Sequence, residues 1–210
     1  MTERGSLIVL SGFSGVGKGT VLRLMMSRYD HYAYSVSATT RQPRTGEVDG
    51  RDYFFKSTEE FESMIERGEL LEYARYVDHY YGTPRAYVRQ QMESGRDVIL
   101  EIEVQGALNI RRMVQDAILI YMLPPDAATL AGRLRGRGTE TDDVIRGRLK
   151  AAAGEARHIS DYDYVIVNDD AERCATRLNG LIEAQRLRTA RNVAFIKEIQ
   201  EGLEREARDN

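Results

Sequence analysis

Short apolar runs alternate with amphipathic stretches along most of the chain. Such runs predict buried strands, because a strand that is covered on both faces needs no polar side. The runs are residues 7–10, 98–104, 118–123 and 164–167. Apolar residues at helical spacing lie between them, over residues 18–29, 105–114, 126–137 and 142–159. This order predicts an α/β fold with helices on both faces of a mainly parallel sheet.

Residues 34–84 break this rhythm. The segments there are shorter, richer in aromatic residues and alternating in polarity, as in Tyr34-Ser-Val-Ser. One helix is marked by Ser57 and Glu60, which form a capping-box sequence ahead of Phe61. We predict a small β-rich insertion that stands off the main sheet.

The last segment, residues 185–210, is highly charged but keeps an apolar stripe at helical spacing. The stripe consists of Val193, Ile196, Ile199 and Leu203. This pattern predicts a solvated helix that packs one face on the body of the protein. A dimerisation helix is the alternative, and the sequence leaves monomer and homo-oligomer open.

Composition narrows the class of protein. A chain of 210 residues with 42% hydrophobic and 30% charged residues suits one globular domain. Its net charge of −3 argues against bulk nucleic-acid binding. The longest strongly apolar run, residues 117–123, is too short to cross a membrane, and the N-terminus lacks a signal peptide, so we expect a cytoplasmic protein. The single cysteine, Cys174, lies in a helical pattern and is expected to be a packed core residue.

A phosphate-binding loop follows the first predicted strand. Residues 12–18 read Gly-Phe-Ser-Gly-Val-Gly-Lys, and the predicted helix begins at the lysine. Backbone N–H groups of such a loop surround phosphate oxygens, and Lys18 supplies a full charge for the β- and γ-phosphates. The fold class is therefore of the P-loop NTPase type. The loop residues predicted to bind a nucleoside triphosphate are Gly12, Phe13, Ser14, Gly15, Val16, Gly17, Lys18, Gly19 and Thr20.

The loop departs from the usual pattern at Gly19, where a Ser or Thr normally ligates Mg²⁺. The hydroxyl of Thr20, one residue later, is the only direct protein ligand that the motif suggests. We expect Mg²⁺ to be held mostly through water and the phosphates of the nucleotide. Phe13 is expected on the outer turn of the loop, where substitutions are tolerated.

Several further motifs are similar to those of the guanylate kinase family. They begin with Ser37-Ala-Thr-Thr-Arg41-Gln-Pro-Arg44 and Gly46-Glu-Val-Asp-Gly50-Arg-Asp-Tyr53. They continue with Leu71-Glu72-Tyr73, Tyr80-Tyr81-Gly82-Thr83 and Glu101-Ile-Glu103-Val-Gln-Gly106. The last are Arg137-Gly138-Thr139-Glu140 and Val165-Ile-Val-Asn168-Asp169-Asp170. The resemblance covers about residues 5–184, with the insertion at about 34–84 and a helical lid at about 126–158.

The resemblance implies transfer of a phosphoryl group from ATP to GMP, with Mg²⁺ as cofactor. Arg41, Arg44, Tyr53 and Tyr81 would hold the GMP phosphate, a sensible set for a dianion. The residues implied for the rest of GMP are Ser37, Glu72, Thr83, Glu101 and Glu103. A carboxylate such as Glu72 accepts from guanine N1–H and N2–H₂, whereas adenine N1 is itself an acceptor. Which of Glu101 and Glu103 reaches GMP or metal-bound water is left open.

The segment from Arg133 to Lys150 carries six basic residues against three acids. The resemblance implies that its arginines close over the ATP phosphates, with Arg137 and Arg148 as the catalytic pair and Arg133 next. Asn168 is implied to lie near the adenine. Together with Lys18, Arg41 and Arg44, the two lid arginines form the predicted catalytic set.

A phosphate acceptor is already ionised at neutral pH, so no general base is expected. None of the three histidines lies in a motif. Two other interpretations stay open at this point. One is a guanylate-kinase-like peptide-binding module without catalysis, and the other is a P-loop kinase for a phosphorylated ribose derivative. ATP and GMP are the expected small-molecule partners, with neither nucleic acid nor a membrane.

Overall fold

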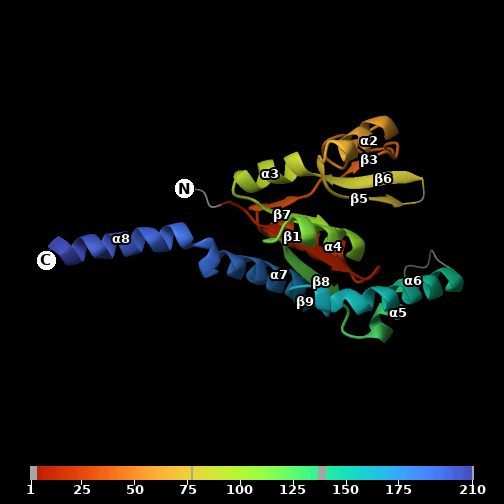
Figure 1. The fold of residues 1–210 in the computed structure, drawn as a ribbon. Coiled ribbons are helices and arrows are strands. Elements are labelled where there is room, and N and C mark those ends of the chain that lie inside the picture. Colours follow the sequence, from red (N-terminus) through yellow and green to blue (C-terminus); the bar gives the residue numbers. More distant parts are fainter. Residues whose placement is uncertain (1–3, 77, 137–140, 210) are drawn as a thin grey trace.

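The structure, a computed structural model, describes residues 4–76, 78–136 and 141–209. Its centre is a five-stranded parallel sheet in the order β2-β7-β1-β8-β9 (Figure 1). The strands are β1 (Leu7–Gly12), β2 (Tyr32–Tyr34), β7 (Asp97–Glu101), β8 (Ile118–Leu123) and β9 (Tyr164–Val167). In the central strand, Ile8 pairs with Ile99 on one side and with Ile118 on the other.

Helices cover both faces of this sheet, as the apolar runs predicted. Alternate residues of β1 enter two different cores, because neighbouring side chains of a strand point to opposite faces. Ile8 and Leu10 pack with α1 (Lys18–Arg28) and α7 (Ala171–Arg186). Leu7 and Val9 pack with α3 (Arg85–Glu93) and α4 (Val104–Met113). The predicted fold class is confirmed.

Two element boundaries differ from the prediction. The strand expected over 98–104 ends at Glu101, because Glu103 is the N-cap of α4 and Val104 is the first residue of that helix. The helix expected over 142–159 is α6 (Asp142–Glu155), which tightens into the 3₁₀ helix η1 (Ala156–Asp161). The preceding lid helix is α5 (Ala127–Arg135).

The inserted segment forms a second sheet of four strands in the order β4-β3-β6-β5. Its elements are β3 (Ala38–Thr39), β4 (Phe54–Phe55), α2 (Thr58–Glu66), β5 (Leu70–Tyr76) and β6 (His79–Pro84). The predicted capping box is present at the start of α2, where Ser57 and Glu60 each accept from the backbone N–H of the other. Phe61 fills a small separate core and stacks on Tyr80.

The aromatic segment at Tyr34 was predicted to belong to the insertion, and this is wrong. Tyr32, Ala33 and Tyr34 pair in parallel with Asp97, Val98 and Ile99, so β2 is an edge strand of the main sheet. β2 ends at Tyr34, so the alternating segment Tyr34-Ser-Val-Ser mostly follows the strand rather than forming it. The chain leaves the main sheet only after Tyr34.

The C-terminal helix α8 (Val193–Asp209) follows α7 and the short η2 (Thr189–Arg191). It projects from the body of the protein, as the blue helix in Figure 1 shows. Val193, Ile199 and Leu203 are 61%, 48% and 65% exposed. The expectation that this stripe packs on the body is therefore wrong. In the described part of the chain, no helix is long and apolar enough to cross a membrane.

Candidate active site

The phosphate loop joins β1 to α1 at the carboxyl edge of the main sheet. Gly15 and Gly17 have φ values of 84° and 100°, in the left-handed region that favours glycine. A Cβ atom on Gly17 would lie 2.6 Å from Nδ2 of Asn168, so no larger residue fits there. The sharp turn after Val16 therefore depends on both the glycine and the close approach of Asn168.

Lys18, the first residue of α1, folds its side chain back over the loop. Its Nζ donates to the carbonyl of Gly12 at 2.7 Å. Burial lowers the pKa of Lys18, while the charges of Glu101, Glu155 and Glu103 oppose this shift. Three carboxylates thus stabilise the ammonium group at the position where a triphosphate would bind.

Phe13 does not lie on an outer turn as predicted. Its side chain is buried and packs edge-on against Tyr121, with ring centroids 5.3 Å apart. Val16 is also fully buried. Only the backbone of these two residues remains for phosphate binding, and their side chains anchor the loop in the core. The expected tolerance at Phe13 is not supported by this burial.

Asn168 and Arg133 hold the loop from the side of β9. Asn168 Nδ2 donates to the carbonyl of Val16 at 2.8 Å, and its Oδ1 has no hydrogen-bond partner among the described residues. Arg133 donates to the carbonyls of Val16 and Asn168 at 3.0 and 2.9 Å. The guanidinium of Arg133 is thus engaged with backbone, and its contact with ATP phosphates stays a prediction.

The lid helix α6 reaches the phosphate loop through Arg148. Its Nη1 lies 3.4 Å from Oγ of Ser14, at the limit of a weak hydrogen bond. This places one predicted catalytic arginine over the loop. Arg137, the other, lies outside the described residues, as do Gly138, Thr139 and Glu140.

Thr20 and Gly19 are the loop positions that decide whether a side-chain hydroxyl could ligate Mg²⁺. The Thr20 side chain is exposed, and its hydroxyl accepts from Nη2 of Arg23 at 3.3 Å. A Cβ atom on Gly19 would lie 4.0 Å from Oε2 of Glu101. The space that a Ser or Thr side chain would occupy is therefore next to a carboxylate of β7.

Glu72 and Thr83, on neighbouring strands of the second sheet, form a buried pair. The Thr83 hydroxyl donates to Oε1 of Glu72 at 2.6 Å, and both residues are buried. Burial raises the pKa of Glu72, and the bond from Thr83 lowers it in part. Gly106 lies next to the other oxygen, since a Cβ atom on Gly106 would be 3.2 Å from Glu72 Oε2. This pair offers a fixed acceptor group.

A small cavity lies between the two sheets beside this pair. Its lining includes three predicted GMP residues from the insertion, Ser37, Tyr53 and Thr83, and Glu101 from the main sheet. Tyr34 also lines it and donates from its hydroxyl to Oε2 of Glu101 at 3.0 Å. Burial is the main cause that raises the pKa of Tyr34, so the hydroxyl keeps its proton. Glu101 thus borders both the cavity and the phosphate loop.

Arg41, Tyr53 and Tyr81 come together at the edge of the insertion. The Arg41 guanidinium carbon lies 5.3 Å from the centre of the Tyr53 ring, and the Tyr53 and Tyr81 rings are 6.1 Å apart. Arg41 Nη2 donates to both oxygens of Glu47, at 2.8 and 2.9 Å. Glu47 also accepts from the backbone N–H of Arg44 at 2.8 Å, which is the main cause of its lowered pKa. The Arg44 side chain is exposed at the rim.

Three residues of this region were missed by the sequence analysis. Glu47 holds Arg41, Tyr34 holds Glu101, and Glu155 faces Lys18 from the end of α6. Glu47 lies in the motif Gly46-Glu-Val-Asp-Gly50 and could have been identified there. Tyr34 and Glu155 lie in a strand and a helix whose local patterns carry no sign of the partners.

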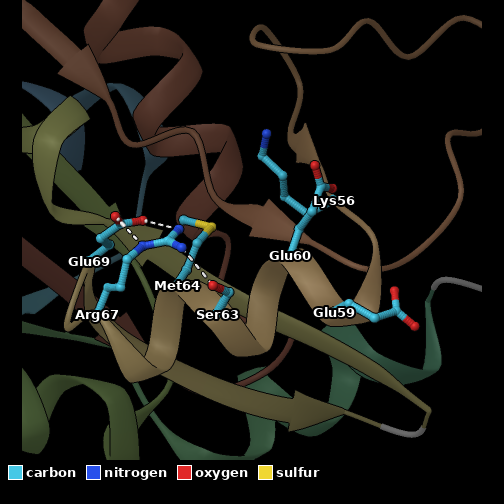
Figure 2. Close-up of a pocket in the computed structure, with 7 residues that line it drawn as sticks. All are labelled: Lys56, Glu59, Glu60, Ser63, Met64, Arg67 and Glu69. Atoms are coloured by element: carbon cyan, nitrogen blue, oxygen red, sulfur yellow. Dashed lines mark hydrogen bonds and ion pairs between the residues drawn. The ribbon is translucent and has the colours of Figure 1, made fainter.

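A larger groove lies elsewhere on the insertion. It has a volume of about 540 Å³ and runs along α2. Figure 2 shows Arg67 at its end, bonded to Glu69 at 2.7 Å and to Ser63 at 2.6 Å. None of the predicted site residues lines this groove. Its size alone therefore does not make it the substrate site.

Comparisons with known proteins identify the family of the chain. The guanylate kinase family model matches residues 4–185. Guanylate kinase of Streptococcus thermophilus (strain CNRZ 1066) is 52% identical over 200 residues, which cover 95% of this chain and 96% of that protein. Guanylate kinase of Lactococcus lactis subsp. lactis (strain IL1403) is 52% identical over 191 residues, 91% of this chain and 93% of that protein. The crystal structure of guanylate kinase from Anaplasma phagocytophilum superposes with a TM-score of 0.70 at 34% identity, covering 90% of both chains. This chain belongs to the guanylate kinase family.

Proposed function

We propose that the chain transfers the γ-phosphoryl group of ATP to GMP, giving ADP and GDP, with the residues described above. The observation that carries the assignment is the position of Glu101. Its carboxylate lies beside Gly19 of the phosphate loop and lines the cavity that holds Ser37, Tyr53 and Thr83. When the site of the phosphoryl donor and the site of the phosphoryl acceptor have Glu101 in common, they can hold the two phosphates in line.

GMP is proposed to bind with its base toward Glu72 and Thr83. The guanine N1–H and N2–H₂ donors would meet Glu72, whose Thr83 bond and Gly106 backing keep the carboxylate in place. Adenine would present a lone pair to that carboxylate, which disfavours AMP. The GMP phosphate would meet Arg41, Arg44, Tyr53 and Tyr81, with Glu47 orienting Arg41.

ATP is proposed to bind with its β- and γ-phosphates in the loop. Lys18, now on the Gly12 carbonyl, would turn to the phosphates and compensate their charge. Arg148 already lies near Ser14, and Arg137 is proposed to join it. Oδ1 of Asn168, which accepts no hydrogen bond from the residues that the structure describes, is an acceptor beside the loop and supports an adenine-side role.

The donor set around Lys18 fits Mg²⁺, which prefers oxygen ligands and keeps several waters. Glu101, Glu103 and Glu155 all exert their charge on Lys18. We propose that Glu103 and Glu155 hold metal-bound water, while Glu101 serves the GMP side. When bound, the ion would supply positive charge that offsets the charge of the ATP phosphates. The carboxylates alone would repel ATP, so this arrangement calls for a divalent cation.

The reaction needs positioning and charge neutralisation rather than a proton-accepting side chain. The GMP phosphate is already ionised at neutral pH, with a second pKa near ~6. The arginines and Lys18 offset the repulsion of two polyanions and stabilise the dispersed charge of the transition state. Closing α6 over the loop would exclude water as a competing acceptor.

An ADP-release assay with ATP and Mg²⁺ tests this proposal, with GMP, AMP, UMP and dTMP offered separately. We expect turnover with GMP alone at micromolar to millimolar substrate. No turnover with GMP by folded protein would overturn the activity. Equal turnover with AMP would overturn the role of Glu72. No observation favours a peptide-binding module or a ribose-directed kinase.

A further inference from the structure

Tyr34 and Glu101 are the last residues of two neighbouring parallel strands, and their side chains meet at the carboxyl edge of the main sheet. The hydroxyl of Tyr34 donates to Oε2 of Glu101 at 3.0 Å, and both residues line the small cavity between the two sheets, the acceptor cavity. A hydrogen bond to a charged acceptor is stronger than a neutral one, so this bond can hold the carboxylate in one orientation. Among the residues that the structure describes, none donates a hydrogen bond to the other oxygen, Oε1.

The backbone of Tyr34 is fixed from two sides. Tyr34 pairs with Ile99 of β7, and the next residue, Ser35, donates its backbone N–H to the carbonyl of Ile99 at 2.9 Å. On the other side, the hydroxyl of Tyr87 in α3 donates to the carbonyl of Tyr34 at 3.2 Å. Tyr34 is 42% exposed, so its ring is not needed to fill the core. The hydroxyl of Tyr34, rather than the volume of its ring, is therefore the group that bears on the site.

Lys18 is subject to the charge of the same carboxylate from the phosphate loop. Burial lowers the pKa of Lys18, and the charge of Glu101 is the strongest of those that oppose this shift. Within residues 4–76, 78–136 and 141–209, however, no carboxylate forms an ion pair with Lys18, whose Nζ donates to the carbonyl of Gly12. An ammonium group and a carboxylate that border the same loop attract each other. The bond from Tyr34 is the contact that directs Glu101 elsewhere.

We propose that Tyr34 is a positioning residue, which keeps Glu101 in the wall of the acceptor cavity and away from Lys18. The inference rests on the proposed function, because it concerns the same two nucleotide sites. A glutamate side chain is long and flexible, so its orientation has to be fixed by a partner. Without the hydroxyl of Tyr34, Glu101 would turn toward Lys18 and pair with it.

Both nucleotide sites would be impaired by this turn of Glu101. A pair with Glu101 would compensate the charge that Lys18 offers to the ATP phosphates. The acceptor cavity would at the same time lose the carboxylate that lies beside Ser37 and Thr83. Transfer requires both nucleotides in place together, so one hydrogen bond outside the reacting groups affects the binding of each. Tyr34 acts through Glu101 and needs no contact of its own with either nucleotide.

Initial rates of ADP release at varied GMP and at varied ATP test the role of Tyr34. In Tyr34→Phe, we expect KM for each nucleotide to rise about 10-fold, as for loss of a contact that orients a binding group. The rise for ATP follows from the pairing of Lys18 with Glu101, and the rise for GMP follows from the displaced carboxylate. A change confined to one nucleotide would overturn the proposal. KM values within about 2-fold of wild type for both would do the same.

A double-mutant cycle with Glu101→Gln distinguishes positioning from a general effect on the fold. An amide carries no charge that would pair with Lys18, so in the Glu101→Gln background Tyr34→Phe should not change KM for ATP any further. The same fold-change in both backgrounds would contradict the proposal. Tyr87→Phe is the matched control, because its hydroxyl bonds to the carbonyl of Tyr34 and not to Glu101. This control should keep both KM values of the wild-type chain.

Calorimetric titration separates this inference from the proposed function, because it measures binding without turnover. The wild-type chain and Tyr34→Phe are each titrated with GMP alone and with ATP and Mg²⁺ alone, after circular dichroism has shown that both are folded. Tyr34→Phe should bind each nucleotide about 10-fold more weakly. If the wild-type chain binds both nucleotides without transfer, the proposed function fails and the comparison still tests Tyr34. Equal affinities of the two proteins would refute the positioning role, and a wild-type chain that binds neither nucleotide would refute both proposals.

Discussion

The hydroxyl of Thr83 donates a 2.6 Å hydrogen bond to Oε1 of Glu72 between two strands of the second sheet. The bond fixes one oxygen of a buried carboxylate, and Gly106 leaves room for the other. Burial raises the pKa of this carboxyl group, so its ionised form destabilises the folded chain. A carboxylate kept at such a position is best explained by a ligand that donates to it.

Glu72→Gln should separate stability from activity. The pKa of Glu72 is raised in the fold, so the folded chain binds more protons than the unfolded chain above pH 4.5. Its contribution to stability therefore falls as pH rises through the raised pKa. In the variant, the free energy of unfolding should no longer decrease with pH in this way. At neutral pH it should be at least as large as in the wild-type chain. Its kcat/KM for GMP should drop by roughly 10²-fold, because the amide leaves a guanine donor unmatched. Urea unfolding at pH 4 and pH 7.5 measures the pH dependence of the free energy of unfolding, with Glu66→Gln as control.

Lys18→Met should remove nearly all activity and leave GMP binding intact. Lys18 belongs to the phosphate loop and does not line the acceptor cavity. Loss of one charge that stabilises the transition state costs on the order of 10²–10³-fold in kcat. Calorimetric titration with GMP and the ADP-release assay measure the two properties. Lys56→Met, in the groove along α2, is the control (Figure 2). Activity near wild type would contradict the role of the loop.

Glu47→Gln should weaken GMP binding. Glu47 joins the guanidinium of Arg41 to the backbone of Arg44, and the variant loses the ion pair and one of the two hydrogen bonds that Arg41 Nη2 donates to Glu47. We expect KM for GMP to rise about 10-fold with a smaller change in kcat, as for removal of a group that orients a binding residue. Initial rates at varied GMP measure this. A lower KM would instead mean that Glu47 competes with the GMP phosphate for Arg41.

Glu155→Gln should alter the dependence on Mg²⁺. Burial and the charge of Glu103 raise the pKa of Glu155, and Tyr121 lies 3.4 Å from its Oε2. If the carboxylate holds metal-bound water, the variant should need several-fold more Mg²⁺ for half-maximal activity, with KM for GMP unchanged. Titration of activity against Mg²⁺ measures this. Asp143→Asn on the exposed side of α6 is the matched control. An unchanged Mg²⁺ midpoint would exclude the proposed role.

Phe13→Ala should destabilise the fold. The buried Phe13 ring packs on Tyr121, so its loss leaves a cavity beneath the phosphate loop. Removal of a buried phenyl ring lowers the free energy of unfolding by about 3 kcal/mol or more. Urea unfolding measures the change, and Phe195→Ala on the exposed helix serves as control. A change below about 0.5 kcal/mol would indicate that the loop closes over the gap.

The local pattern of the chain was enough to predict four of the five strands of the main sheet, most helices and the phosphate loop. Buried parallel strands require uninterrupted apolar runs, and α2 begins at the capping box that the sequence shows. The loop was predictable because its glycines and Lys18 act through positions close in sequence. The family resemblance, rather than the pattern, implied that Glu72 and Thr83 share one site, and the hydrogen bond between them was not predicted.

Only the tertiary structure decided which residues meet across elements. Tyr34 lies on an edge strand of the main sheet and contacts Glu101, 67 positions away, and the charge of Glu155 raises the pKa of Lys18 from the end of α6. Such contacts depend on strand order and crossovers, which local hydrophobicity does not encode. The burial of Phe13 and the exposure of α8 have the same origin. An apolar residue has the same pattern whether its cover is the core, the body or a second chain, and only the packed fold distinguishes them.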